Sequence, residues 1–381
     1  MKNFVKLIGQ IHENRYSKVL KNIIENKIPV AFLSSNPLAQ AVEIAKNFRA
    51  QALNIKTLIV VDLKSPPPVN LDFEIVNVNA IDKFYPKPEY IFVMGNKDLK
   101  FAEQAVPNAK IIWSPYANTD DAYEMFMSHL PELQEVYESL IDEDSKKTFC
   151  GYWLGNISNI LGEIFYANTS QYICAGFIPN AGDVFIDCGS CDGNTAARFA
   201  KMGCKVYSFE LDKVNYELGR KLAKEYKFIL ENLALGAYKH EITYRRVQGN
   251  NGISRQDFEG SEKALCTSLD FYVREKNLPR VDFIKMDVEG AELDVLKGAA
   301  NTIARYKPIL ALSVYHKWDD FWTLMNFVKS IRPDYEFAMR QYKFFHEDDP
   351  ILFDEGLVDF LESFGFDVKM STPGECILFA R

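Results

Sequence analysis

The sequence has no apolar run long enough to cross a membrane. No window in its 381 residues reaches the roughly 18 uninterrupted apolar positions that a membrane-spanning helix needs. The first segment, MKNFVKLIGQIHENRY, carries Lys2 and Lys6, but polar side chains from Gln10 onward interrupt the apolar core that a signal peptide requires. We therefore expect no membrane span and no secretory signal, and we predict a cytoplasmic protein.

A surplus of positive charge is also absent. Lys and Arg total 44 against 52 Asp and Glu, which gives a formal net charge of −8. Proteins that bind phosphate backbones broadly carry basic surfaces, because Lys and Arg neutralise the phosphates. The charge balance therefore argues against nucleic acid as a partner.

The cysteines lack the number and spacing of a disulfide or zinc framework. There are seven, an odd number scattered along the chain, which predicts reduced thiols. Cys188 and Cys191 form a C-x-x-C pair, but no second pair and no nearby histidine accompanies them in the sequence. We therefore expect neither a zinc site nor a redox centre there.

Glycine is missing from the first strand-to-helix turn of the chain. Residues 1–27 have the apolar period of two amphipathic helices. Short apolar runs typical of strands follow, alternating at first with a helical segment, and predict a small Rossmann-like α/β domain over residues 1–118; the runs are PVAFLSS, KTLIVVD, FEIVNVN, YIFVMG and AKIIWSP. The turn after the first run, Ser34 to Pro37, has no glycine to admit a pyrophosphate. This favours a structural or substrate-positioning role over dinucleotide binding.

A second domain is predicted over residues 181–381, after a helical connector at 119–180. Its expected strands are VFID, KVYSFE, FILENL, ITYRRV, DFIKMD and PILALSVY, with YEFAMRQY and ECILFAR as an antiparallel pair at the sheet edge. One helix is expected between Gly290 and Pro308, with an apolar face made by Leu293, Leu296, Ala300 and Ile303.

The turn after strand 184–187 has the features of a cofactor loop. Gly189 and Gly193 bracket it in a G-x-x-x-G spacing, unlike the G-x-G-x-x-G of dinucleotide sites. Their missing Cβ atoms let a ligand approach the backbone, and the following helix offers free N–H groups. Glu210 ends the next strand, 21 residues after Gly189, where its carboxylate can accept hydrogen bonds from two ribose hydroxyls. Taken alone, the glycine turn also fits ordinary packing, and Glu210 also fits a solvated loop carboxylate. Together with Asp187, the two features favour a nucleoside cofactor.

These segments resemble the FkbM-type methyltransferases over about residues 170–342 and the final strand. VFIDCGSCDGNT is similar to the family's cofactor loop, SFELDKVN to its acidic second-strand end, ENLALGA to its adenine-side loop, and VDFIKMDVEGAELDVLKGA to its most recognisable block. The resemblance implies a class I methyltransferase fold, which is Rossmann-like with a mostly parallel sheet and an antiparallel last strand. It also implies S-adenosylmethionine as the donor and transfer to oxygen, often of a sugar or polyketide.

The resemblance further implies which residues bind the cofactor. They are Asp187, Gly189, Ser190, Gly193, Glu210, Leu211, Asn232, Ala234 and Asp287. Two features depart from the commonest form of the family, namely the large amino-terminal domain and an insertion at 343–373. Additions of this kind usually shape the acceptor pocket, so the acceptor stays open.

Two side chains are predicted to carry catalysis. Asp287 ends strand 282–287 at the sheet edge where open α/β sheets bind ligands, and we expect it near the sulfonium or the acceptor hydroxyl. His316 follows strand 308–315 at the same edge and is our candidate general base, because imidazole titrates near working pH. Two alternatives stay open, a surface histidine at the start of a loop and catalysis by alignment alone.

Several neighbouring side chains admit more than one interpretation. Glu289 and Glu292 fit acid/base or metal-binding roles, but acids are also favoured at a helix start. We therefore assign no metal ligand, and whether a divalent cation is used stays open. Aromatic residues after the strand fit either an acceptor wall or core packing, with core packing favoured; they are Tyr315, Trp318 and Trp322.

The sequence as a whole favours an S-adenosylmethionine-dependent O-methyltransferase. Its acceptor would be a sugar, a glycan precursor or another small hydroxylated molecule. An NAD-dependent oxidoreductase is the alternative from another enzyme class, disfavoured by the glycine spacing. A module that binds the cofactor without catalysis is a third possibility. The sequence does not indicate the oligomeric state.

Overall fold

The computed structural model of the chain describes residues 2–50, 52–61, 71–83, 88–93, 98, 101–102, 106, 108–113, 120–246, 254–256, 262–342 and 375–381. The chain divides into two compact units. One unit comprises Met1–Leu130, Phe149–Phe165 and Lys369–Ser371, and the other comprises Pro131–Thr148, Tyr166–Val368 and Thr372–Arg381. The domain boundaries expected at residues 118 and 180 stay a prediction.

The first unit contains the expected helices and parallel sheet. Helices α1 (Lys2–Asn14) and α2 (Tyr16–Glu25) are the two predicted amphipathic helices, and Leu7 and Ile23 lie on their buried faces. All strand pairs in the sheet are parallel, in the order β3-β2-β1-β4-β5, and the strands are β1 (Val30–Ser34), β2 (Ile55–Val60), β3 (Glu74–Asn77), β4 (Tyr90–Val93) and β5 (Lys110–Trp113). Helix α3 (Leu38–Ala50) buries Phe48 in the core of this unit.

Further helices lie between β3 and β6 in the chain. They are η1 (Val78–Lys83), α5 (Asp120–Ser128), α6 (Leu130–Ser139), α7 (Glu143–Ser158) and η2 (Leu161–Glu163). Helices α5, α6 and α7 lie within the predicted connector, which is helical as expected over these ranges.

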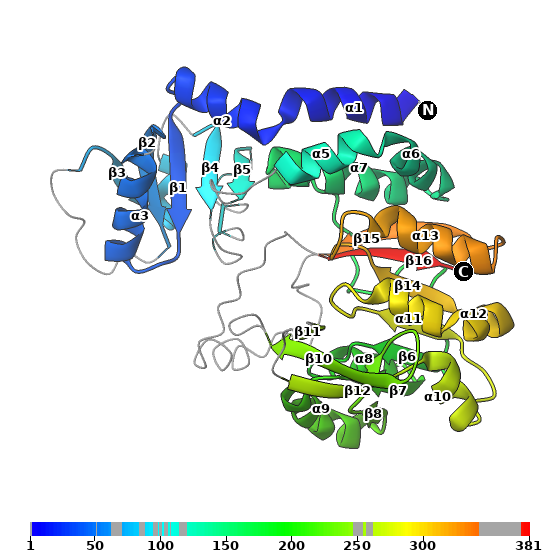
Figure 1. Ribbon diagram of the computed structural model, residues 1–381. Coiled ribbons are helices and arrows are strands. Elements are labelled where there is room, and N and C mark those ends of the chain that lie inside the picture. Colours follow the sequence, from blue (N-terminus) through cyan, green and yellow to red (C-terminus); the bar gives the residue numbers. More distant parts are fainter. Residues whose placement is uncertain are drawn as a thin grey trace. The chain divides into compact units, whose positions relative to one another are not determined.

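The second unit is built on a seven-stranded sheet. Its order is β15-β16-β14-β13-β6-β7-β8, and the strands are β6 (Val184–Cys188), β7 (Lys205–Phe209), β8 (Ile229–Glu231), β13 (Phe283–Met286), β14 (Ile309–Ser313), β15 (Phe337–Tyr342) and β16 (Glu375–Ala380). Five of the strands, β8 to β14 along this order, pair in parallel. Strand β16 pairs antiparallel with both β14 and β15, beside which it lies in Figure 1. The predicted antiparallel pair at the sheet edge is therefore confirmed.

The connections of this sheet reverse direction between β6 and β13. From β6 the chain runs outward through β7 to β8, whereas from β13 it runs the opposite way to β14. Right-handed crossovers then place α8 (Asn194–Lys201) and α9 (Lys213–Tyr226) on one face and the helices after β13 on the other. The carboxyl ends of β6 and β13 thus form the topological switch point, where open α/β sheets bind ligands.

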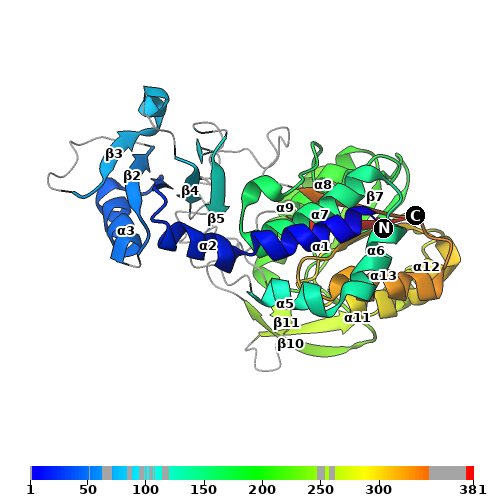
Figure 2. The same cartoon turned by 90° about the horizontal axis from the view of Figure 1, so that it is seen from above.

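The helices beyond β13 differ in detail from the sequence prediction. The single helix expected before Pro308 is two short helices, α11 (Glu292–Gly298) and α12 (Ala300–Tyr306), because the backbone leaves the helical region at Ala299, where φ is −111° and ψ is 0°. Helix α13 (Asp320–Ile331) begins after Trp318, so Trp318 and Trp322 do not share a helix. Helices α11, α12 and α13 lie against one another (Figure 2).

A second, four-stranded sheet lies between β8 and β13 in the chain. Its order is β11-β10-β12-β9, and its strands are β9 (Ala234–Leu235), β10 (His240–Arg246), β11 (Ser254–Gln256) and β12 (Glu262–Thr267). The segment ITYRRV is a strand as predicted, but it pairs here and not in the main sheet. Strand β12 was not predicted. Helix α10 (Leu269–Glu275) follows it.

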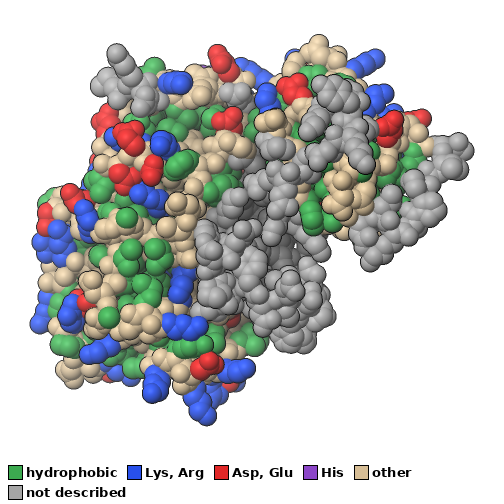
Figure 3. All heavy atoms as spheres, turned by 180° about the vertical axis from the view of Figure 1, so that it is seen from behind, with side chains coloured by type: hydrophobic (Ala, Val, Ile, Leu, Met, Phe, Trp, Pro, Cys, Tyr) green, Lys and Arg blue, Asp and Glu red, His purple; other side chains and the backbone are tan. Residues whose placement is uncertain are grey.

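The surface and the thiols agree with the composition. Acidic and basic side chains are scattered across the face shown in Figure 3, with hydrophobic and uncharged surface between them. Among the helices that the structure describes, none has the length and apolar character to cross a bilayer. All seven cysteines are free thiols, as predicted.

Candidate functional site

The switch point brings together the ends of two neighbouring strands. In the parallel pair β6 and β13, Asp187 faces Lys285 in register, and the N–H of Asp287 donates a hydrogen bond of 3.0 Å to the carbonyl of Cys188. The loop that follows Cys188 therefore runs directly beside Asp287. The sequence predicted this neighbourhood from the positions of the two strand ends.

Gly189 is required by this close approach. Its φ is +87°, and a Cβ atom at this position would lie 1.8 Å from the carbonyl oxygen of Asp287. The space of the missing side chain is thus filled by the backbone after β13. The expectation that this glycine leaves room for the cofactor was wrong in its physical reason, although backbone contact with a ligand stays a prediction.

Gly193 and Ser190 shape the rest of the turn. Gly193 has φ +86° and precedes α8, and a Cβ there would lie 3.3 Å from the Cα of Gly219 on α9. The N–H groups of Gly189 and Ser190 both donate to the carbonyl of Phe209 at the end of β7. The Ser190 hydroxyl is buried, and its oxygen makes no hydrogen bond within the described residues.

Glu210 fastens the cofactor turn to the end of β7. One carboxylate oxygen accepts 2.7 Å from the N–H of Cys191, and the other accepts 2.8 Å from the N–H of Asp212. Burial raises the pKa of this carboxyl to about 7, against the lowering effect of those two N–H groups. Each oxygen keeps a further lone pair, so the carboxylate can still accept hydrogen bonds from ligand hydroxyls.

The other predicted cofactor residues gather near Glu210. The side-chain amide of Asn232 donates to the carbonyls of Glu210 and Leu211, at 2.9 and 3.2 Å. Leu211 packs against the buried cluster that contains Ala234 on β9. The structure thus places these four residues together, around the ends of β7 and β8.

Asp187 is fully buried and binds protein groups. Its carboxylate accepts 2.6 Å from the Ser208 hydroxyl and lies 3.1 Å from the ammonium of Lys285. The same ammonium donates to the carbonyl of Gly189. Burial lowers the pKa of Lys285, but Asp187 and Asp287 outweigh it and hold that pKa above its usual range. Asp187 therefore acts on the cofactor turn through Lys285.

Asp287 receives hydrogen bonds from two tyrosines. The Tyr172 hydroxyl donates to it at 2.7 Å and the Tyr315 hydroxyl at 3.3 Å. Burial raises the pKa of Asp287, but Lys285, His316 and the tyrosine hydroxyls together bring it below its usual value. The side chain is 16% exposed, so an ionised carboxylate is partly open at the switch point.

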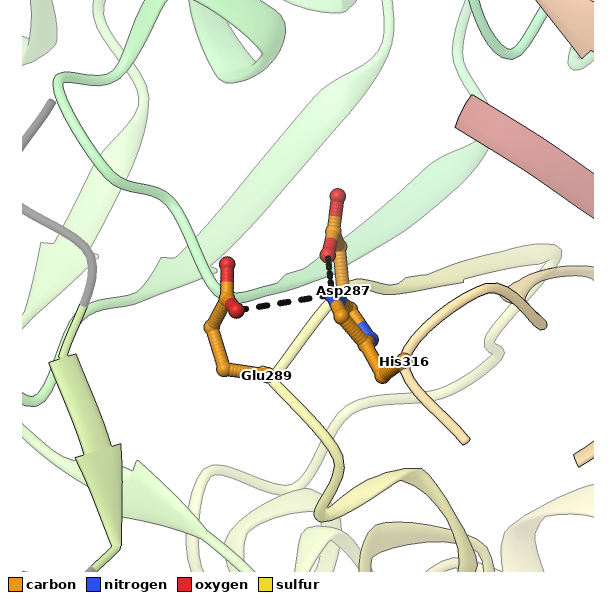
Figure 4. Close-up of side chains that lie close together, drawn as sticks. All are labelled: Asp287, Glu289 and His316. Atoms are coloured by element: carbon orange, nitrogen blue, oxygen red, sulfur yellow. Dashed lines mark ion pairs between the residues drawn. The ribbon is translucent and has the colours of Figure 1, made fainter. Parts of the chain in front are cut away.

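His316 is buried beside three carboxylates. Its side chain is 4% exposed, which contradicts the alternative of a surface histidine. Nδ1 lies 2.8 Å from Glu292. On the other side of the ring, Nε2 lies 3.4 Å from Asp287 and 3.5 Å from Glu289 (Figure 4). Burial lowers the pKa of the imidazole, but the bond to Glu292 and the charges of Asp287 and Glu289 raise it to about 9. At neutral pH the ring of this structure is therefore protonated, and its role as a general base stays a prediction.

Glu292 stabilises the loop before α11. Its fully buried carboxylate accepts hydrogen bonds from the N–H groups of Val288 at 3.0 Å and Gly290 at 3.4 Å, besides its contact with His316. These bonds agree with the helix-start interpretation. Trp322 is buried on α13, in agreement with core packing.

Comparison with known proteins identifies the carboxy-terminal part of the chain. The methyltransferase FkbM domain family matches residues 187–367. Residues 187–367 are therefore similar to this methyltransferase family. The family recognised from the cofactor loop and from the block around Asp287 is therefore confirmed, and the match supports a methyltransferase with S-adenosylmethionine as its cofactor. A comparison with curated proteins gives no match.

Solved structures support the fold of the FkbM domain and of the chain around it. A methyltransferase FkbM from Methylobacillus flagellatus KT is 14% identical, with a TM-score of 0.61 over 99% of this chain and 98% of its own. This likeness confirms the predicted class I methyltransferase fold. An rRNA methylase from Streptococcus thermophilus (15% identity, TM-score 0.31, 56% and 99% coverage) and a Haemonchus contortus phosphoethanolamine N-methyltransferase 2 in complex with S-adenosyl-L-methionine (10%, 0.29, 99% and 97%) are too dissimilar to support any argument.

The candidate site also contains residues that sequence reasoning missed. They are Tyr172, Ser208, Lys285 and Glu375. Lys285 could have been recognised from the sequence, because it is a charged residue inside the apolar run FIKM of a buried strand. Tyr172 had none, because it is 115 residues from Asp287 in the chain. Burial and the charge of Asp287 raise the pKa of Glu375 to about 8.

Proposed function

We propose that the chain is an S-adenosylmethionine-dependent O-methyltransferase of a sugar, a glycan precursor or another small hydroxylated acceptor. The observation that carries the proposal is the convergence, inside an FkbM domain, of the turn after β6, Glu210 and Asp287 at one switch point. This is the edge at which open α/β sheets bind nucleotide-like ligands.

The donor lies along the ends of β6, β7 and β8 in this proposal. Glu210 accepts the ribose hydroxyls with the lone pairs that its two backbone bonds leave unused. Asn232, Leu211 and Ala234 border the adenine side. Asp187 holds the turn in place through Lys285, whose ammonium donates to the Gly189 carbonyl.

The acceptor lies over Asp287 and His316 in this proposal. Its hydroxyl oxygen attacks the methyl carbon of the sulfonium, the carbon–sulfur bond breaks, and S-adenosylhomocysteine and the hydroxyl proton leave. Alignment of the oxygen with the methyl group supplies much of the rate enhancement of such a step. Asp287 is placed to hold that hydroxyl, because its carboxylate is partly open and fixed by two tyrosines.

Donor binding tests the proposal directly. Glu210→Ala should weaken S-adenosylmethionine binding by about 1–3 kcal/mol, because buried ligand hydroxyls lose a charged partner. The matched control is Glu217→Ala, an exposed carboxylate on α9 that pairs with Arg220. Calorimetric titration with S-adenosylmethionine and with NAD⁺ also distinguishes a methyltransferase from an oxidoreductase, because only one of the two cofactors should bind tightly. Unchanged donor affinity in Glu210→Ala would remove this residue from the site.

An acceptor screen tests catalysis. Protein with methyl-labelled donor should transfer label to a member of a panel of nucleotide sugars, glycans and phenols. A labelled ether would identify the acceptor class and establish transfer to oxygen. Label found on nitrogen or carbon would contradict the proposed chemistry, and donor binding without any transfer across the panel would favour the non-catalytic alternative.

A further inference from the structure

Three side chains with metal-ligand chemistry converge at the switch point. Asp287, Glu289 and His316 each offer one ligand atom, and these atoms lie within 4.8 Å of one another (Figure 4). Asp287 directly follows β13, Glu289 lies in the loop before α11, and His316 follows β14. Two carboxylates and one imidazole, presented by neighbouring strand ends, form the donor set.

The imidazole of His316 provides a second, independent observation. Its side chain is only 4% exposed, and Nε2 makes no hydrogen bond within the part of the chain that the structure describes. The ring edge that carries Nε2 faces Asp287 and Glu289, at 3.4 and 3.5 Å. A buried nitrogen without a hydrogen bond, directed at two carboxylates, indicates that this position is built to hold something between them.

Glu292 orients the ring in the way that metal-binding histidines are oriented. Its carboxylate lies 2.8 Å from Nδ1, and backbone N–H groups of Val288 and Gly290 hold that carboxylate in place. In metal sites a carboxylate that accepts from one imidazole nitrogen fixes the tautomer and leaves the other nitrogen for the ion. Glu292 and His316 have this arrangement, because Glu292 contacts Nδ1 and Nε2 is directed toward the other two carboxylates.

The proposed ligands lie among further acidic side chains. Asp287, Glu289 and Glu292 all contact His316, and Glu375 on β16 interacts electrostatically with Asp287 and Glu289. The nearby cations are Lys285, which Asp187 and the Gly189 carbonyl engage, and the protonated ring of His316 itself, whose Nε2 proton a bound ion would replace. Carboxylates gathered in a low-dielectric place are costly unless positive charge compensates them.

We propose that Asp287, Glu289 and His316 bind a divalent transition-metal ion, with Mn²⁺ and Zn²⁺ as the ions to test. At a metal–ligand distance of about 2.1 Å, ligand atoms in tetrahedral positions lie about 3.4 Å apart, close to the two separations measured from Nε2. Carboxylates suit Mn²⁺ and imidazole suits Zn²⁺. Because an imidazole ligand is neutral, binding releases the Nε2 proton.

Three protein ligands leave further coordination positions open. In a role that rests on the proposed function, the acceptor hydroxyl occupies one of them, and the ion lowers the pKa of that hydroxyl and aligns its oxygen with the donor methyl. The ion would then perform the task for which His316 was first considered. The site itself does not depend on this role, because the fold and the contact with Glu292 set the positions of its ligands.

Ion binding by the full chain tests the site. The protein is stripped with chelator, desalted and titrated with Mn²⁺, with free Mn²⁺ followed by electron paramagnetic resonance, and with Zn²⁺ by calorimetry. We expect one equivalent to bind. Glu289→Gln should weaken that binding about tenfold or more, since loss of even an outer-shell partner of a metal ligand costs about tenfold, and His316→Ala should do the same. The control is Asp294→Asn, an exposed carboxylate on α11 that pairs with Lys297, and it should bind as the parent does.

Each result of this titration bears on the proposal. Absence of stoichiometric binding by the parent protein overturns it, and so does equal affinity in the parent and Glu289→Gln. If His316→Ala does not fold, Glu289→Gln still decides, since its side chain is 20% exposed and the amide has the same shape. Donor affinity is measured on the same samples. Donor binding without ion binding overturns the metal site alone, whereas ion binding without donor binding overturns the proposed function alone.

Discussion

At the scale of single residues, the buried ammonium of Lys285 organises the switch point. Lys285 pairs with Asp187, donates to the carbonyl of Gly189 and lowers the pKa of Asp287. Its ammonium therefore links the strand carrying the cofactor turn to the carboxylate at the proposed acceptor position. A lysine in a buried strand is tolerated only when such partners compensate its charge.

Lys285→Met should destabilise the protein by about 3–5 kcal/mol, because it leaves Asp187 buried without its partner. Denaturant unfolding measures the loss. Lys307→Met is the control, since the pair of Lys307 with Asp334 is solvent-exposed, and exposed pairs contribute about 0–1 kcal/mol. Adding Asp187→Asn to Lys285→Met should recover part of the loss, and strictly additive losses would contradict the pairing.

Gly189→Ala should destabilise the protein more than Gly182→Ala does. Both glycines have a left-handed backbone, with φ +87° and +90°, but a Cβ at Gly182 would meet nothing within 4 Å. The matched variants share a strain of order 1–3 kcal/mol, and the collision with the Asp287 carbonyl adds to it only at Gly189. Thermal unfolding of the two variants compares them. Equal losses of stability in the two variants would show that the turn after β6 moves away from the Asp287 carbonyl at no cost.

The stability of the ligand-free protein should fall as Glu210 ionises. Its pKa is 4.5 in ordinary surroundings and about 7 in the folded protein. The folded state therefore keeps this proton more tightly, so the stability it contributes is present at low pH and is lost as the pH rises from 4.5 to 7. The scale is on the order of 3 kcal/mol.

Comparison with Glu210→Gln isolates this dependence. The variant cannot ionise, so its stability relative to the parent should be higher at pH 8 than at pH 5, whatever the lost hydrogen bond costs at both values. Glu217→Gln, at an exposed position, should show no such trend. A constant difference between pH 5 and pH 8 would mean that Glu210 ionises as an ordinary carboxyl does.

At the scale of elements, local patterns were predictable and pairing partners were not. Apolar runs identified every strand of the main sheet, because a strand buried on both faces reads as a short continuous apolar segment. The sheet membership of β10 depends on β12, a partner that the apolar pattern did not reveal. The break at Ala299 follows Gly298, which was a usable signal.

Arg340 joins the first turn of α7 to β15. Its guanidinium donates to both carboxylate oxygens of Asp142, at 3.2 and 3.1 Å, and to the Ser145 hydroxyl at 2.8 Å. Arg340→Lys keeps the charge but cannot form the two-pronged contact. It should cost about 1–3 kcal/mol, the range for hydrogen bonds to charged groups. Arg332→Lys, on an exposed pair with Asp334, is the control for denaturant unfolding, and equal losses would contradict this role.

At the scale of the whole molecule, the family match and the structural likeness differ in how much of the chain they cover. The FkbM match spans residues 187–367, whereas the likeness to the Methylobacillus structure spans 99% of the chain. The amino-terminal sheet was predictable from its alternating apolar segments. The function of that unit was not predictable, because the turn after its first strand lacks the glycines of a nucleotide-binding loop. The cytoplasmic location and the lack of a nucleic-acid partner also stay predictions. The predicted insertion at 343–373 lies outside the described residues.

The pairing of β15 with β16 has a consequence for how such enzymes diversify. Tyr342 and Glu375 face each other across the two strands, so the chain leaves and re-enters the sheet at a single rung. Because the ends of the segment between them are fixed against each other, insertions and deletions within it need not shift either strand. If additions at 343–373 shape the acceptor pocket, as the sequence predicts, a change in this segment alters the acceptor without changing the pairing of β15 with β16.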